Sequence, residues 1–181
     1  MDTAPDSYGS FWHYLSRAQK DLLLEGDYLI NNVIKTGNYQ FKDYSFLIFP
    51  YAKAYEGFLK QLFLDKKYIS HLDYISTHLR LGKLMSPNLV GRLGDRSIYQ
   101  KLVVNTSQET ADMIWQTWTL GRNQVFHYFP HNFKAVSFET AQDIISQIIN
   151  TMERAYAELQ PDTKEIVERT EVHGNIHAVQ A

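Results

Sequence analysis

The sequence contains no cysteine, and this absence excludes several kinds of chemistry at once. Without a thiol the chain has no disulfide bond, no cysteine nucleophile and no zinc site made from thiolate ligands. The longest apolar run, over residues 45–52, is far shorter than the roughly 20 residues that a membrane-spanning helix needs. The acidic start of the chain is not followed by an apolar segment, so it does not resemble a signal peptide. We therefore expect a cytoplasmic protein that is not inserted in a membrane.

Familiar catalytic motifs are missing as well. The chain has no Gly-x-Gly-x-x-Gly, no Walker loop and no His-Glu-x-x-His, and no serine stands in a recognisable arrangement with a base. His71 and His78 lie seven residues apart, but no third ligand follows at a spacing that suits a metal. The sequence therefore predicts neither a metal nor a cofactor.

Helical spacing of apolar residues, without an alternating strand pattern, predicts an all-α fold. The apolar content of 44% in 181 residues is sufficient for the core of one domain. We expect that domain over residues 1–160, as a bundle of four main helices plus short helices. Residues 161–181 are polar and lack a clear period, which predicts a flexible tail.

The main helices are expected to begin at recognisable caps. Ser7 or Ser10 is the expected cap of the first, which ends near Lys35. Its expected core face is Phe11, Tyr14, Leu15, Ala18, Leu22 and Ile30. The other main helices are expected over residues 43–67, from Ser107 to the residue before Pro130, and from Ser137 to Leu159. Shorter helices are expected over residues 71–78 and 96–104, with loops over residues 86–88 and 91–95.

Pro50 interrupts the second main helix of this prediction. Proline removes a backbone donor inside a helix but is well tolerated in the first turn. Pro50 therefore either kinks the helix or marks its first turn.

Arg122 is the least expected residue in the third main helix. It falls within a stripe made from Ala111, Trp115, Trp118, Val125 and Phe129. A buried guanidinium without a partner is costly, so we expect Arg122 to contact an anion. That anion is either a carboxylate such as Glu56 or the phosphate of a ligand.

Glu56 lies on the shoulder of the apolar arc of the second helix, beside the face that carries Lys53 and Lys60. Two interpretations remain open. Glu56 is either an ordinary partner of Lys60 at i,i+4 or a partly buried carboxylate with a functional role.

The charge of the chain is unevenly distributed although its net value is only −2. Residues 51–101 carry nine Lys or Arg and four Asp or Glu, whereas residues 102–181 carry five and ten. The basic middle is either a surface for a polyanion or a set of ordinary solvated helix faces. If the polyanion is RNA, the candidate contacts are Lys53, Lys60, Arg80, Lys83, Arg92 and Arg96.

Arg122, Asn123 and His127 form an Arg-Asn-x-x-x-His motif near the end of the third helix. In an all-α chain of this size the motif resembles that of the HEPN superfamily. The segment from Tyr55 to Lys60, with Glu56 as its acid, is similar to the acidic helix of HEPN toxins of the RNase LS type. The resemblance covers about residues 8–160.

This resemblance implies a homodimer in which two motifs meet at a cleft that cuts RNA without a metal. His127 would act as the acid or base, because histidine titrates near neutral pH. Arg122 would bind the phosphate in the transition state. Asn123 would orient His127 or the phosphate, and Glu56 would orient Arg122. The expected products carry a 2′,3′-cyclic phosphate and a 5′-OH.

The spacing of the motif raises a geometric question. Residues five apart on an ideal α-helix point about 140° away from each other. Arg122 and His127 therefore require long side chains, a distortion near Gly121 or a site shared between two copies.

Three functions are compatible with these residues. The first is a ribonuclease that acts as a toxin or phage-defence effector and is restrained by an inhibitory partner such as an antitoxin. The second is a HEPN protein paired with a nucleotidyltransferase that modifies a tyrosine two residues after the histidine. That position is Phe129 here, and Tyr128 directly follows His127. The third is a non-catalytic helical interaction module in which Arg122, Glu56 and His127 form only a polar network.

Overall fold

The computed structural model describes residues 8–125 and 135–160, and all regular structure in these ranges is helical. The all-α prediction is therefore confirmed. The long elements are α1 (Arg17–Tyr28) with its continuation η2 (Leu29–Ile34), α2 (Ser45–Asp65), α7 (Gln108–Trp118) with its continuation η5 (Thr119–Gln124), and α8 (Phe138–Leu159). The short ones are η1 (Ser10–Tyr14), α3 (His71–Ile75), α4 (Leu81–Leu84), η3 (Pro87–Leu89), α5 (Val90–Leu93), η4 (Gly94–Arg96) and α6 (Ile98–Asn105).

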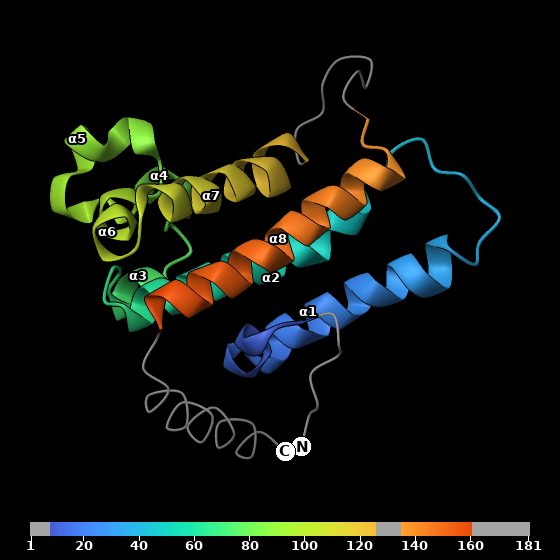
Figure 1. Ribbon diagram of the computed structural model, residues 1–181, viewed down its shortest axis with the longest axis horizontal. Helices are drawn as coiled ribbons and strands as arrows, with labels where there is room; N and C mark the ends of the chain where they lie inside the picture. The colour runs from blue at the N-terminus through green and yellow to red at the C-terminus, as the bar shows by residue number, and fades with distance from the viewer. Residues whose placement is uncertain (1–7, 126–134, 161–181) are drawn as a thin grey trace.

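The four long elements form a bundle in which α2 is central (Figure 1). Helices α1 and α7 run in one direction, and α2 and α8 run in the other. Helix α2 packs against α1, α8 and η5. The short helices α3 to α6 gather at the end of the bundle where α7 begins.

Burial of one long apolar arc explains the central place of α2. The arc predicted for this helix is buried in full: Ile48, Tyr51, Ala52, Tyr55, Phe58, Leu59, Leu62 and Phe63. Pro50 lies inside the helix and is itself buried, so it does not mark the first turn. One continuous core extends from Tyr8 to Leu159.

The beginning of the first main helix differs from the prediction. A 3₁₀ turn, η1, ends at Tyr14, and the extended backbone of the next residue, Leu15 (ψ 140°), breaks the helix. Ser16, and not Ser10, is the N-cap of α1, because Ser16 and Gln19 form a reciprocal capping box. This later start rotates the helix, so that Gln19, Leu23 and Gly26 are buried while Ala18 is exposed. The other expected cap, Ser7, lies outside the described residues.

The predicted caps of α7 and α8 are confirmed. The Ser107 hydroxyl accepts a hydrogen bond from Thr110 N at 3.1 Å, and the Ser137 hydroxyl accepts one from Thr140 N at 3.0 Å. The expected loops over residues 86–88 and 91–95 are instead short helical turns, in η3, α5 and η4. The predicted tail over residues 161–181 lies outside the described residues. Within the described part of the chain, no helix combines the length and apolarity needed to cross a membrane.

Gly26 allows α1 to pack closely on α2. A Cβ at this position would lie 2.4 and 2.7 Å from two ring carbons of Tyr51. That ring is buried, and its hydroxyl donates a hydrogen bond to Asp27 Oδ1 at 2.7 Å, which limits how far it can move.

We predict that Gly26→Ala destabilises the protein by about 1–3 kcal/mol despite the better helix propensity of alanine, because overpacking in a core exceeds a propensity gain of about 1 kcal/mol. Gly91→Ala is the matched control, since a Cβ there meets no atom within 4 Å. Denaturant unfolding measures both changes. Equal stability of the two variants would contradict the close packing of α1 on α2.

Candidate functional site

Helix α7 ends in a π turn, η5, which carries Arg122. The hydroxyl of Thr119 donates to Trp115 O at 3.0 Å and so competes with the backbone for this carbonyl. Gly121 is buried, and a Cβ there would lie 3.1 Å from Ile148 Cδ1. Turns of this kind are rare and often occur at functional sites. A distortion near Gly121, one of the three alternatives for the motif geometry, is therefore present.

Arg122 contacts Glu56 across the interface between η5 and α2. Arg122 Nη2 lies 3.5 Å from Glu56 Oε2, and Lys60 Nζ lies 3.5 Å from Glu56 Oε1. Each carboxylate oxygen therefore has one cationic partner. Of the two anions expected for Arg122, the structure shows the carboxylate of Glu56, and it also shows the i,i+4 contact of Glu56 with Lys60 that one of the two interpretations predicts.

The predicted burial of Arg122 is wrong. Its side chain is 47% exposed, and that of Glu56 is 25% exposed. The extra residue in the π turn changes the register, so that Gly121 faces the core and Arg122 lies at its edge. Because Arg122 is not a buried charge, we expect no gain in stability from Arg122→Ala.

Trp118 is the second neighbour of the Arg122 guanidinium. The Arg122 Cζ atom lies 5.0 Å from the centroid of the Trp118 ring, within the range of a cation–π contact. From the sequence, Trp118 was expected only as a member of the apolar stripe. Its i,i+4 spacing from Arg122 is the signal that identifies the contact, because residues four apart are neighbours on a helix.

The guanidinium is thus oriented and still accessible. An arginine has five N–H donors in a planar fork, which matches the oxygens of a phosphate. One guanidinium nitrogen lies near Glu56 and Cζ lies near the Trp118 ring, while 47% of the side chain remains exposed. This arrangement is suited to binding a phosphate of a larger ligand at the surface.

Two residues of the predicted motif cannot be placed in this geometry. His127 lies outside the described residues, and although Asn123 belongs to η5, its side chain is not among the described ones. A π turn closes backbone hydrogen bonds from i to i+5, which brings residues five apart closer to one face than an α-helix does. The turn η5 ends at Gln124, before His127, so it does not by itself answer the angular question raised by the motif.

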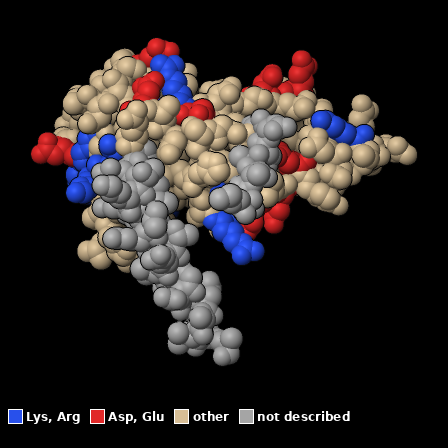
Figure 2. Space-filling view, turned by 60° about the horizontal axis from the view of Figure 1, so that its bottom comes forward, with Lys and Arg blue, Asp and Glu red and all other residues tan. Residues whose placement is uncertain are grey.

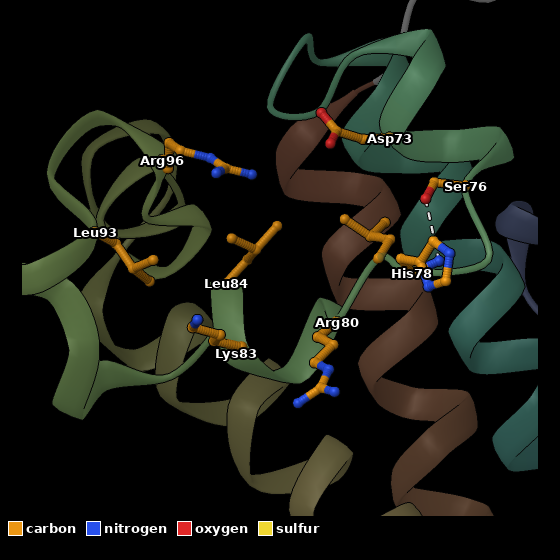
Figure 3. A pocket seen from close by; sticks show the side chains of 9 residues that line it. Asp73, Ser76, His78, Arg80, Lys83, Leu84, Leu93 and Arg96 are labelled. Atoms are coloured by element: carbon orange, nitrogen blue, oxygen red, sulfur yellow. Dashed lines mark hydrogen bonds between the residues drawn. The ribbon is translucent and has the colours of Figure 1, made fainter.

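The six predicted RNA contacts do not form one surface. Lys53 and Lys60 lie on the same face of α2 as Glu56. Arg80, Lys83 and Arg96 instead line a separate pocket beside α3, α4 and η4 (Figure 3). Arg92 on α5 is exposed and does not line it. On the face shown in Figure 2, Lys and Arg also form several separate groups.

Comparisons of the chain with protein-family models, with curated proteins and with solved structures give no match. The resemblance to the HEPN superfamily therefore stays a prediction.

Among residues 8–125 and 135–160, no three His, Asp or Glu side chains cluster in a way that could hold a metal ion.

We predict that Glu56→Gln and Arg122→Ala each change the free energy of unfolding by less than about 1 kcal/mol, because partly exposed ion pairs contribute little. Denaturant unfolding at low and moderate salt is the measurement. Lys60→Gln is the control, since it removes the other cation beside Glu56 and leaves Arg122 in place. A gain of several kcal/mol in Arg122→Ala would restore the buried-charge interpretation.

Proposed function

We propose that this protein is a metal-independent endoribonuclease in which Arg122 binds the phosphate that is cut. The observation that supports the proposal is the partly exposed side chain of Arg122, whose guanidinium contacts both Glu56 and the Trp118 ring. An oriented cation costs little reorganisation when charge develops on a phosphate, which is the condition for electrostatic catalysis. The HEPN-like motif of Arg122, Asn123 and His127 supports the choice of RNA as the substrate.

The proposed reaction is an internal attack by the ribose. The 2′-oxygen forms a bond to the adjacent phosphorus as the bond to the 5′-oxygen of the next nucleotide breaks. A base takes the proton of the 2′-OH, and an acid supplies a proton to the leaving 5′-oxygen. His127 is assigned to one of these proton transfers, as in the family that the motif resembles. Arg122 stabilises the charge on the other phosphate oxygens, and the products carry 2′,3′-cyclic phosphate and 5′-OH ends.

Glu56 is a positioning residue in this proposal. It contacts Arg122 at 3.5 Å and has no assigned contact with the RNA. Its negative charge near the phosphate is unfavourable by itself, but Lys60 offsets it from the other carboxylate oxygen. The pair Lys60 and Glu56 therefore fixes the arginine fork without making the site negative.

A second copy of the chain is part of the proposal. Phe46 and Phe49 are 40% and 48% exposed, and Phe49 lies two helical turns before Glu56 on the same face of α2. Exposed aromatic side chains beside a polar site are typical of interface cores. A dimer formed through this face would bring the two Arg122 side chains to a shared cleft.

We predict that wild-type protein cleaves RNA in excess EDTA and that Arg122→Ala lowers the rate by roughly 10²–10³-fold, the range found when one charge-stabilising donor is removed. Single-turnover cleavage of labelled RNA, with the product ends mapped, is the measurement. Arg154→Ala is the matched control because Arg154 is also a partly exposed arginine in ion pairs, with Glu109 and Glu158. Unchanged cleavage in Arg122→Ala, or dependence of cleavage on a divalent metal, would contradict the proposal.

We predict that Phe49→Glu weakens dimerisation at least tenfold, since a charge would be buried in an apolar interface. Sedimentation measured over a range of protein concentrations gives the dissociation constant. Leu72→Glu is the control, because Leu72 is an exposed apolar residue on α3 and not on α2. A wild-type monomer that still cleaves RNA would remove the second copy from the mechanism.

A further inference from the structure

The pocket beside α3, α4 and η4 is lined by more positively charged than negatively charged side chains. It has a volume of about 300 Å³, and Arg80, Lys83 and Arg96 line it together with the carboxylate of Asp73 (Figure 3). Figure 3 shows Arg96 pointing from η4 toward the side on which Asp73 lies, with Lys83 and Arg80 beyond Leu84. Three cations from two separate segments therefore surround one cavity.

The only carboxylate among the lining residues is already engaged. Asp73 Oδ2 accepts hydrogen bonds from Ser70 N at 3.0 Å and from Ser70 Oγ at 2.7 Å, as part of the cap of α3. These hydrogen bonds, with a smaller contribution from the charge of Arg96, lower the pKa of Asp73, which therefore stays ionised at neutral pH. Within residues 8–125 and 135–160, none of the three cations forms an ion pair. The lining of the pocket thus carries three positive charges and one negative charge.

The remaining lining residues are the three leucines Leu79, Leu84 and Leu93 and the polar residues Ser76 and His78. The leucines lie among the cations. Small-molecule sites commonly combine an apolar wall with a few polar groups, in volumes from about 300 Å³ upward. A ligand for this pocket should therefore carry a compact anion and a part that can lie against leucine side chains, at the small end of this size range.

We propose that this pocket binds the phosphate monoester of a nucleotide. The phosphate would be held by Arg80, Lys83 and Arg96, because guanidinium forks match phosphate oxygens and a lysine adds a mobile point charge. The base would lie against the leucine side chains. The source of the monoester is either a free mononucleotide or the 5′-phosphate at the end of an RNA strand. This site is distinct from Arg122, which does not line the pocket.

Packing connects the pocket to Trp118. Arg80, the N-cap of α4, and Lys83, within α4, lie on either side of Gly82 in the sequence, and a Cβ on Gly82 would lie only 2.6 Å from Trp118 Nε1. A ligand that draws Arg80 and Lys83 together would therefore alter the surroundings of the Trp118 indole. Tryptophan fluorescence is a direct reporter of binding, and Trp118→Phe identifies which indole responds.

The test is a titration of the full chain with the four nucleoside 5′-monophosphates and the four nucleosides, followed by fluorescence and by calorimetry. A 2′-O-methyl trinucleotide with or without a 5′-phosphate, which has no 2′-OH to attack, tests the second source. We expect at least one phosphorylated probe to bind at least tenfold more tightly than its unphosphorylated counterpart. Tighter binding of the mononucleotide identifies a free nucleotide, and tighter binding of the trinucleotide identifies an RNA end.

The variants locate the binding site. We expect Arg80→Gln and Arg96→Gln each to weaken binding by about tenfold or more, as for the loss of a charged hydrogen bond. Arg80→Lys and Arg96→Lys should lose less, and melting temperatures identify any variant that fails to fold. The matched control, Arg92→Gln, should change binding by less than about twofold, because Arg92 is a nearby arginine outside the pocket.

Three results would overturn the proposal: no preference for phosphorylated probes, equal losses in Arg92→Gln and Arg96→Gln, or loss of binding in Arg122→Ala alone. The last result would mean that nucleotides bind at the proposed catalytic site. None of these measurements depends on RNA cleavage, so the proposed ribonuclease and the proposed nucleotide site can fail independently.

Discussion

Burial of the apolar arc of α2 is the constraint on which the rest of this fold depends. Helices α1 and α8 pack on this arc, and the π turn η5 lies against the same helix. Because the arc occupies the inward side of α2, the polar residues Lys53, Glu56 and Lys60 remain at its edge. Glu56 thereby lies where α7 ends and where Arg122 emerges. The candidate site is a direct consequence of how the central helix is buried.

Regular elements could be predicted from the sequence because their signals are local. The helical spacing in α2 and the serine caps of α7 and α8 each depend on residues within a few positions of one another. The start of α1 could not be predicted, because Ser10 and Ser16 are both plausible caps. The choice depends on the capping box with Gln19 and on contacts of η1 with α8, where Ser10 Oγ donates to Glu153 at 2.7 Å.

Part of the candidate site could be predicted from the sequence. The part that could not be predicted depends on turns that depart from an α-helical period. The pairing of Arg122 with Glu56 was predicted from the cost of a buried charge, and it is present although Arg122 is 47% exposed. The exposure of Arg122 depends on the π turn, which shifts the register by one residue and cannot be read from an α-helical period. The meeting of Arg80, Lys83 and Arg96 depends on a series of short turns without any period, so only the structure brings them together.

The central claim is that Glu56 acts in RNA cleavage through the orientation of Arg122. A double-mutant cycle with Glu56→Gln, Arg122→Gln and the double variant tests it, with single-turnover cleavage rates as the measured quantity. If the claim is correct, the double variant is slower than Arg122→Gln by less than about twofold, because no guanidinium remains for Glu56 to orient. If the rate of the double variant falls by the product of the losses in the two single variants, Glu56 and Arg122 act independently. The orienting role assigned to their 3.5 Å contact is then wrong.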